Sequence, residues 1–410
     1  LPAPPPSAPA TETAALRAEV RAWLGEHWPA GRDVPPKEWL GMVVDARWAV
    51  PTWPPQWYGR GLSGKMAAVT LAEFRAAGAP GAGQDKYNLW ANTLVAYGTD
   101  SAKQRFVRRL LTDDLKMCLL YSEPGAGSDL AAVQTRADRD GDEWVVNGQK
   151  VWTSGAKEAD YGMLIARTNW DVPKHGGISF FWLPMKDNGV EIRPILQITG
   201  ESHFNEVFID SARVPGDHLL GPLDGGWRVL QTALAYERSV MGDMARGPRS
   251  TNKAARTAKA DAARKSMAAL DSATDSATDS ATKPGADDES TFGEASQGAG
   301  VNLWKLAEQM GRLDDPVIRQ RIAQVHIWRT VNTWNGQRAK SQLAQGSSSP
   351  ILSLGKLAMS RILHQAAHVQ RMIVGQEAQL YGKHNPLGDD ANFLSLNAYF
   401  TSIGGGTDQI

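Results

Sequence analysis

Residues 121–129 read YSEPGAGSD and mark the point at which the sequence changes character. Before them, apolar residues recur at three-to-four spacing, as at Leu16, Val20 and Leu24, which is typical of helices. After them, short apolar runs are separated by turn formers such as Asp140-Gly141, which is typical of strands. The small residues of the stretch itself predict a loop whose open backbone N–H groups a ligand can approach closely.

This change predicts an α+β fold in three parts: an N-terminal helical domain over 11–114, a middle antiparallel β domain over 115–221, and a C-terminal helical bundle over 222–410. Residues 1–10 are rich in Pro and Ala and read as a disordered tail rather than a signal peptide. Residues 250–300 are small, polar and charged, with Asp-Ser-Ala-Thr repeated three times, and we expect a mobile surface insertion.

Helical periodicity in the last part is clearest over residues 303–310, 316–343 and 353–380. Pro316 is placed to begin one helix, and Gly382 is placed to end another.

Composition excludes several classes of function. The chain has 410 residues with 44 Lys plus Arg against 44 Asp plus Glu, so no basic field favours nucleic acid. No apolar run approaches the roughly 20 residues of a membrane-spanning helix, and we expect a soluble protein. The only cysteine, Cys118, excludes internal disulfides and cysteine metal cages, and indicates a reducing compartment such as the cytoplasm.

Residues 147–155, NGQKVWTSG, form a second candidate site segment, with Trp152 beside the hydroxyls of Thr153 and Ser154. A flat ring next to a donor could hold a planar cofactor. The alternative is that Trp152 is one of 15 tryptophans filling a core, and that residues 121–129 are a plain Pro-Gly turn. The pairing of the two segments across about 30 residues favours a site.

These two segments resemble the acyl-CoA dehydrogenase family, as do FNEVFIDSARVP at 204–215, GGWRVLQTALAYER at 225–238 and GGGTDQI at 404–410. The resemblance covers residues 11–410 apart from the insertion. It implies FAD as the cofactor, with the ring of Trp152 against the isoalloxazine. It also implies that the hydroxyl of Ser154 reaches the central-ring nitrogen.

The resemblance assigns a larger set of residues to the two ligands. Flavin contacts are implied for Leu120, Tyr121, Ser122, Gly127, Ser128, Trp152, Thr153, Ser154, Gly406 and Thr407. Substrate contacts are implied for Ser128, Tyr236 and Arg238.

Dehydrogenation of an acyl thioester also needs a carboxylate base in a dry pocket. Many relatives carry it in the C-terminal loop, where this chain has Gly405. A second branch, with the isovaleryl and long-chain enzymes, carries it on the helix after GGW, which implies Glu237. Leu230, Leu234 and Glu237 fall at i, i+4 and i+7, so the carboxylate shares an apolar helix face. The alternative is a solvated carboxylate in local ion pairs.

The expected reaction is α,β-dehydrogenation of an acyl-CoA to a trans-2-enoyl-CoA, with an electron-transfer flavoprotein as acceptor and a tetramer as the assembly. Two motifs that hold the adenine half of FAD in relatives are replaced here, by residues 242–253 and by Gly375-Gln376-Glu377-Ala378. The alternatives are an oxidase or flavin monooxygenase of the same fold, or a half-site subunit of a hetero-oligomer.

Overall fold

The computed structural model describes residues 8–31, 33–244, 302–344, 351–380, 382, 385–404 and 406–409. The predicted order of helices, then strands, then helices is confirmed. The described chain forms two compact units, one running to Met241 and resuming at Tyr399, the other running from Gly242 to Ala398. Helix α1 begins at Ala8, inside the stretch predicted as a tail, whereas residues 1–7 and the insertion 250–300 lie outside the described residues.

The N-terminal helices of the first unit pack around a core of aromatic and aliphatic side chains. Leu16, Val20 and Leu24 are buried along one face of the first helix, as their spacing predicts. The side chain of Thr99 accepts a hydrogen bond from the backbone N–H of Ala102 and so caps the last of these helices. The helices are α1 (Ala8–Gly31), α2 (Pro36–Asp45), η1 (Pro55–Trp57), α3 (Gly64–Ala77), α4 (Gln84–Tyr87), α5 (Leu89–Tyr97) and α6 (Asp100–Leu111).

The middle of the chain forms a mixed sheet with the order β6-β7-β3-β2-β4-β5-β8, in which β1 also pairs with β4. Most neighbours are antiparallel, as predicted, but β1 and β2 each pair with β4 in parallel. The strands are β1 (Met117–Leu120), β2 (Arg136–Asp140), β3 (Glu143–Ser154), β4 (Tyr161–Arg167), β5 (Ile178–Pro184), β6 (Val190–Ile195), β7 (Phe204–Pro215) and β8 (Leu219–Leu220); the short helices η2 (Leu130–Ala132) and η3 (Gly216–His218) lie between them.

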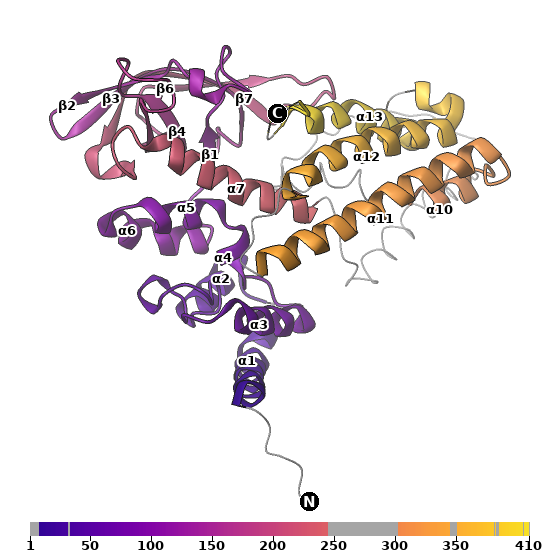
Figure 1. Cartoon of the computed structure of the whole chain (residues 1–410), viewed down its shortest axis with the longest axis horizontal. Helices are drawn as coiled ribbons and strands as arrows, with labels where there is room; N and C mark the ends of the chain where they lie inside the picture. The colour runs from indigo at the N-terminus through magenta and orange to yellow at the C-terminus, as the bar shows by residue number, and fades with distance from the viewer. Residues whose placement is uncertain are drawn as a thin grey trace, which may run out of the picture. The chain divides into compact units, whose positions relative to one another are not determined.

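Strands β4 and β5 are buried on both faces, which explains their nearly unbroken apolar sequences. Met163 and Ile165 pack in a core shared with α5, α6 and α7 (Gly226–Met244). Leu164 and Ala166 point the other way into a second core with β3 and β7. Figure 1 shows α5, α6 and α7 together on one side of the sheet. The sheet and these helices therefore form one packed body.

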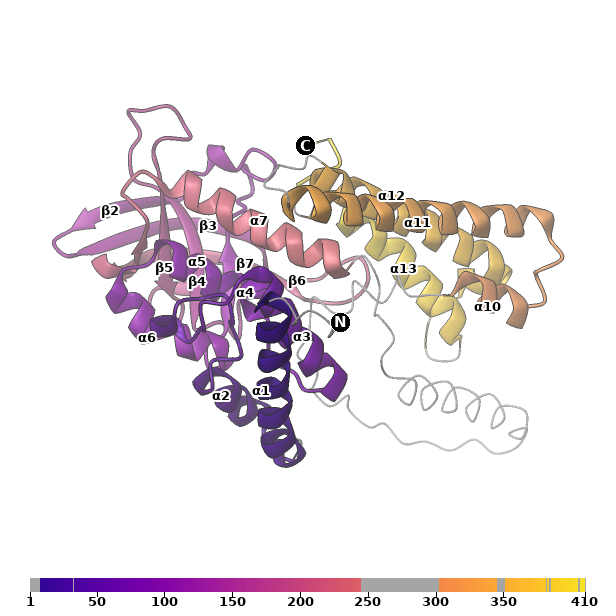
Figure 2. The same ribbon diagram turned by 60° about the horizontal axis from the view of Figure 1, so that its bottom comes forward.

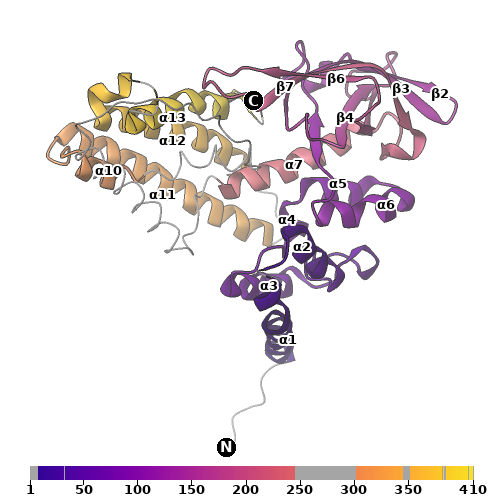
Figure 3. The ribbon, with the colours of Figure 1, turned by 180° about the vertical axis from the view of Figure 1, so that it is seen from behind.

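The second unit contains α10 (Leu303–Gln309), α11 (Pro316–Ala344), α12 (Ile351–Val374), η5 (Gly375–Gln379) and α13 (Pro386–Ile403) as far as Ala398. Helices α11 and α12 lie side by side in Figures 2 and 3. Helix α12 ends at Val374 rather than near Gly382, because Gly375 adopts a φ of +69°, which an α-helix cannot continue. None of the helices in the described part of the chain is long and apolar enough to cross a membrane.

Candidate functional site

The loop after β1 is a tight turn with room around it. The backbone N–H and C=O groups of Glu123 and Ala126 bond to each other at 2.9 and 3.0 Å. A Cβ added at Gly125 or Gly127 would meet nothing within 4 Å. The backbone of this loop is therefore fixed on its inner side and open on its outer side, as a ligand-binding backbone requires.

A bulge at the end of β3 turns the indole of Trp152 outward. Lys150 pairs with Val207 but Thr153 pairs with Asn205, so β3 carries one more residue than β7 between these pairs. Trp152 takes the extra position with a φ of +62°, and its side chain is 59% exposed. The exposed indole is a flat apolar surface at the end of the strand.

The loop and the end of β3 are joined directly. The backbone N–H of Val151 donates to the carbonyl of Ser122 at 2.9 Å. Ser122 and Ser154 are both half-buried. The structure thus brings the two segments predicted to line a flavin into hydrogen-bonding contact with each other, beside the exposed ring of Trp152.

The last described residues lie at the same place within the first unit. The rings of Trp152 and Phe204 meet edge to face at 6.2 Å, and Phe204 is 5.5 Å from Phe400 between ring centroids. The hydroxyl of Ser128 donates to Oγ1 of Thr407 at 3.5 Å. Three segments that are far apart in the sequence therefore meet around one surface, as their predicted common role requires.

The predicted flavin residues differ in what they expose. The side chains of Leu120, Tyr121 and Thr153 are buried, so a ligand at this surface could reach these residues only through their backbones. Gly406 is half-buried with a φ of +100°, and the neighbouring Gly405 lies outside the described residues. The predicted residues with at least partly accessible side chains or Cα groups are Ser122, Gly127, Ser128, Trp152, Ser154, Gly406 and Thr407.

Helix α7 carries the predicted base. Leu230 is buried in the core, and position 237 lies two turns further along the same face of the helix. The side chains of Glu237 and Arg238 lie outside the described residues. The neighbouring Tyr236 is half-buried, and burial, together with nearby Tyr97, raises the pKa of its phenol. The predicted substrate side of α7 is therefore only partly described.

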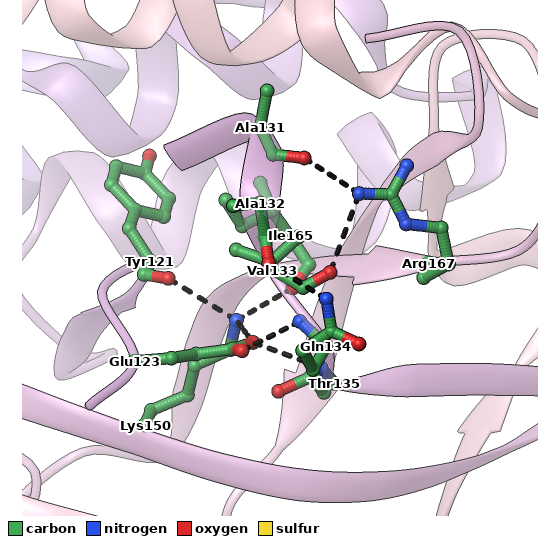
Figure 4. A network of polar contacts seen from close by, with 10 residues as sticks. All are labelled: Tyr121, Glu123, Ala131, Ala132, Val133, Gln134, Thr135, Lys150, Ile165 and Arg167. Carbon is green, nitrogen blue, oxygen red and sulfur yellow. Dashed lines mark hydrogen bonds and ion pairs between the residues drawn. The ribbon is translucent and has the colours of Figure 1, made fainter. Parts of the chain in front are cut away.

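A buried ion pair, not singled out as a site by the sequence, lies directly behind the loop (Figure 4). The ammonium of Lys150 is fully buried and donates to Oε1 of Glu123 at 2.7 Å. It also donates to the carbonyls of Ile165 at 2.9 Å and Tyr121 at 3.2 Å. Burial lowers the pKa of Lys150 to about 8, although Glu123 favours the charged form. At neutral pH the ammonium remains protonated.

The carboxylate of Glu123 holds the other side of the loop. Its oxygens accept from the backbone N–H groups of Gln134 at 2.6 Å and Thr135 at 2.9 Å. Burial opposes the charge, but Lys150 and these donors outweigh it, so the pKa of Glu123 lies below its usual value. Arg167 completes the network by donating to the carbonyls of Ala131 and Val133.

The residues that meet here suit a planar, polar-edged ring system. The exposed indole offers an apolar face, the half-buried hydroxyls of Ser122 and Ser154 offer donors, and the glycine-rich loop offers space. Residues Gly375–Gln379, where the resemblance leads us to expect an adenine-side motif, form a 3-10 helix. The described surface therefore fits the ring end of a flavin by the chemistry of its residues.

Comparisons with known proteins agree with this architecture. The model of the acyl-CoA dehydrogenase N-terminal domain matches residues 10–114, and that of the middle domain matches residues 118–211. Acyl-CoA dehydrogenase IpdE1 of Mycobacterium tuberculosis is 40% identical over 245 residues, covering 55% of this chain and 63% of that protein. Acyl-CoA dehydrogenase IpdE1 of Mycolicibacterium smegmatis is 37% identical over 365 residues, covering 81% and 78%.

A solved structure described as the Tcur3481-Tcur3483 steroid ACAD shares the fold, with a TM-score of 0.64 at 24% identity, over 98% of this chain and 94% of that chain. The matched part of this chain thus spans less than two thirds of the first relative and more than three quarters of the second. Two adjacent domain matches and a relative matched over most of its length lead to one conclusion: the chain belongs to the acyl-CoA dehydrogenase family.

Proposed function

We propose that this protein catalyses the FAD-dependent α,β-dehydrogenation of an acyl-CoA thioester to a trans-2-enoyl-CoA. The observation that carries the proposal is the meeting of three segments, the loop at 121–128, the end of β3 and residues 406–407, around the exposed ring of Trp152. Membership of the acyl-CoA dehydrogenase family supports it independently. Bound FAD would supply the acceptor for the hydride that leaves the β carbon.

The chain's own residues would orient the flavin and exclude water. Trp152 would cover one face of the ring, and the hydroxyl of Ser154 would donate to its central nitrogen. The loop would contribute backbone N–H groups near Ser122 and Gly127, in addition to the Ser122 hydroxyl. Leu120, Tyr121 and Thr153 would act through their backbones, because their side chains are buried. Gly406 and Thr407 would close the same surface from the C-terminal side.

Glu237 is the proposed base, taking the α proton of the thioester onto its carboxylate. Position 237 lies two turns after the buried Leu230 on the same face of α7. The alternative position, in the C-terminal loop, is Gly405, which has no side chain to accept a proton. A base in this role takes the α proton and then holds it. Ser128, Tyr236 and Arg238 would contact the substrate.

Replacing Glu237 by glutamine tests this assignment. The expected result is a protein that binds FAD but whose flavin is no longer bleached by acyl-CoA under anaerobic conditions, because the α proton has no acceptor. Gln231→Ala is a matched control, since Gln231 is exposed on the same helix and should bleach like the wild type. Bleaching that persists in Glu237→Gln would exclude Glu237 as the base.

We propose a bulky or branched acyl group as substrate and an electron-transfer flavoprotein as acceptor. A base on the helix, as in the isovaleryl and long-chain enzymes, supports the first, and so does the structural neighbour described as a steroid ACAD. A panel of acyl-CoAs, short, long and steroidal, with an artificial electron acceptor would rank the substrates. Turnover of short straight chains alone would contradict the proposal.

A second candidate is a half-site subunit that pairs with a different chain, as an alternative to a homo-tetramer. The replacement of the adenine-side motifs favours it, and so does the double name of the structural neighbour, Tcur3481-Tcur3483. Flavin absorbance of the purified chain decides between them, because a colourless chain could not act alone. An oxidase or monooxygenase of the same fold would instead consume oxygen without an acceptor protein, which a peroxide assay detects.

A further inference from the structure

The ion pair between Lys150 and Glu123 connects the two halves of the proposed flavin surface. Lys150 lies two residues before Trp152 on β3, and it donates to the carbonyl of Tyr121, the residue before Ser122. The carbonyl of Ser122 in turn accepts from the N–H of Val151. The buried ammonium of Lys150 thus comes from the strand that carries the indole and donates a hydrogen bond to Tyr121, the first residue of the loop.

The pair uses nearly all of its bonding capacity. The three N–H donors of Lys150 match the three acceptors around it, which belong to the loop root, to the carboxylate and to β4. The carboxylate of Glu123 accepts from Lys150 and from the two N–H groups that precede β2. Buried charges persist when they are paired and fully hydrogen-bonded in this way.

The two charges cannot exchange places. Position 123 faces backbone N–H groups, which need an acceptor, and position 150 faces backbone carbonyls, which need a donor. The arrangement is therefore specific for holding four backbone groups at fixed positions, rather than for neutralising a charge. A buried network of this kind favours one rigid arrangement over alternatives.

We propose that Lys150 and Glu123 are positioning residues that hold the loop at 121–128 and the indole of Trp152 in a single preformed arrangement for the flavin ring. The inference rests on the proposed function, because it assumes that this surface binds the flavin. Preformed sites bind more tightly because their groups need not be ordered on binding. Loss of the pair would therefore weaken flavin binding although both side chains are buried.

Flavin binding to the apoprotein provides the test. Glu123→Gln keeps the volume but turns an NH₂ group towards backbone N–H groups, and Lys150→Met keeps the length but removes every donor. We expect each variant to bind FAD about 10-fold to 100-fold more weakly, the range found when groups that orient metal ligands are removed. We also expect faster hydrogen exchange at residues 121–135 in the absence of FAD, and an altered flavin absorbance spectrum in the loaded protein.

Glu73→Gln is the matched control. Glu73 is a buried carboxylate paired with Arg21 at 2.6 Å between α1 and α3, and none of its hydrogen bonds or ion pairs among the described residues involves the loop. We expect it to lower thermal stability while leaving the dissociation constant for FAD within twofold of the wild type.

The outcomes separate the inference from the proposed function. If the wild type binds FAD and a folded variant binds it equally well with an unchanged spectrum, the pair has only a structural role and the inference is wrong. If Lys150→Met does not fold, the dissociation constants for FAD of Glu123→Gln and Glu73→Gln are compared, and equal values would show that the inference is wrong. A wild-type chain that binds no FAD would contradict the proposed function, and the inference with it.

Discussion

Replacement of Lys150 by methionine should cost the protein a large part of its stability. The change leaves the carboxylate of Glu123, which is 7% exposed, without a counter-charge. It also leaves the carbonyls of Tyr121 and Ile165 without their donor. Breaking a buried pair by removing one partner costs about 3–5 kcal/mol. This total already includes the desolvation penalty that disappears when the charge of Lys150 is removed. We therefore expect the free energy of unfolding to fall by about 4 kcal/mol at pH 7.

Guanidinium unfolding followed by circular dichroism measures this loss, and the melting temperature should fall by roughly 5 °C for a chain of 410 residues. In the variant, the N–H groups of Gln134 and Thr135 still favour the carboxylate, but the charge of Lys150 no longer offsets burial, so the pKa of Glu123 rises from its wild-type value. Acidification therefore costs the folded variant less than the folded wild type, and part of the loss should return as the pH falls. A loss below about 1 kcal/mol, or one that grows on acidification, would refute the reasoning.

Three further predictions concern other sites. A Cβ at Gly226 would lie 2.5 Å from the carbonyl carbon of Ser179, so Gly226→Ala should lower stability by about 1–3 kcal/mol, whereas Gly64→Ala, with nothing within 4 Å, should melt like the wild type. Burial raises the pKa of the Cys118 thiol, so a thiol reagent should label it only as fast as the protein unfolds; immediate labelling would contradict this. Burial lowers the pKa of His218, so the unfolded state binds more protons than the folded state at acidic pH. The free energy of unfolding should therefore fall as the pH drops through 6.5, by up to about 1.4 kcal/mol per pH unit. His218→Gln should flatten this pH dependence, and an unchanged slope in the variant would contradict the prediction.

Sequence periodicity predicted which segments are helices and strands, because burial repeats with the period of the backbone. The spacing of Leu16, Val20 and Leu24 places all three in the core. Periodicity carries no information about which strands pair, and so the parallel neighbours of β4 were not predicted. The early end of α12 depends on the φ of Gly375. The sequence does not show which of the 40 glycines in the chain adopts a positive φ.

The two segments of the site could be predicted because their residue types and spacing match a known family. The buried pair was not, although a signal was present. Trp144, Val146 and Lys150 occupy alternate, inward-facing positions of β3, and an inward-facing lysine requires a buried partner. The preceding motif contains two acids, Asp129 and Glu123, and only the structure identifies Glu123 as the partner. Its contacts with backbone N–H groups depend on loop geometry, which the sequence does not encode.

The bulge at Trp152 interrupts the regular alternation of inward and outward side chains along β3. Residues 150 and 152 would face the same side of a regular strand, yet the ammonium of Lys150 points into the protein and the indole of Trp152 points out. Because of the extra residue, the alternation of inward and outward side chains is offset by one position across the bulge. The core determines that Lys150 points inward, and the surface site determines that Trp152 points outward. Inserting one residue into β7 between Asn205 and Val207 would remove the bulge and put Lys150 and Trp152 on the same side of the strand, and the protein would then have either an inward indole or an outward lysine.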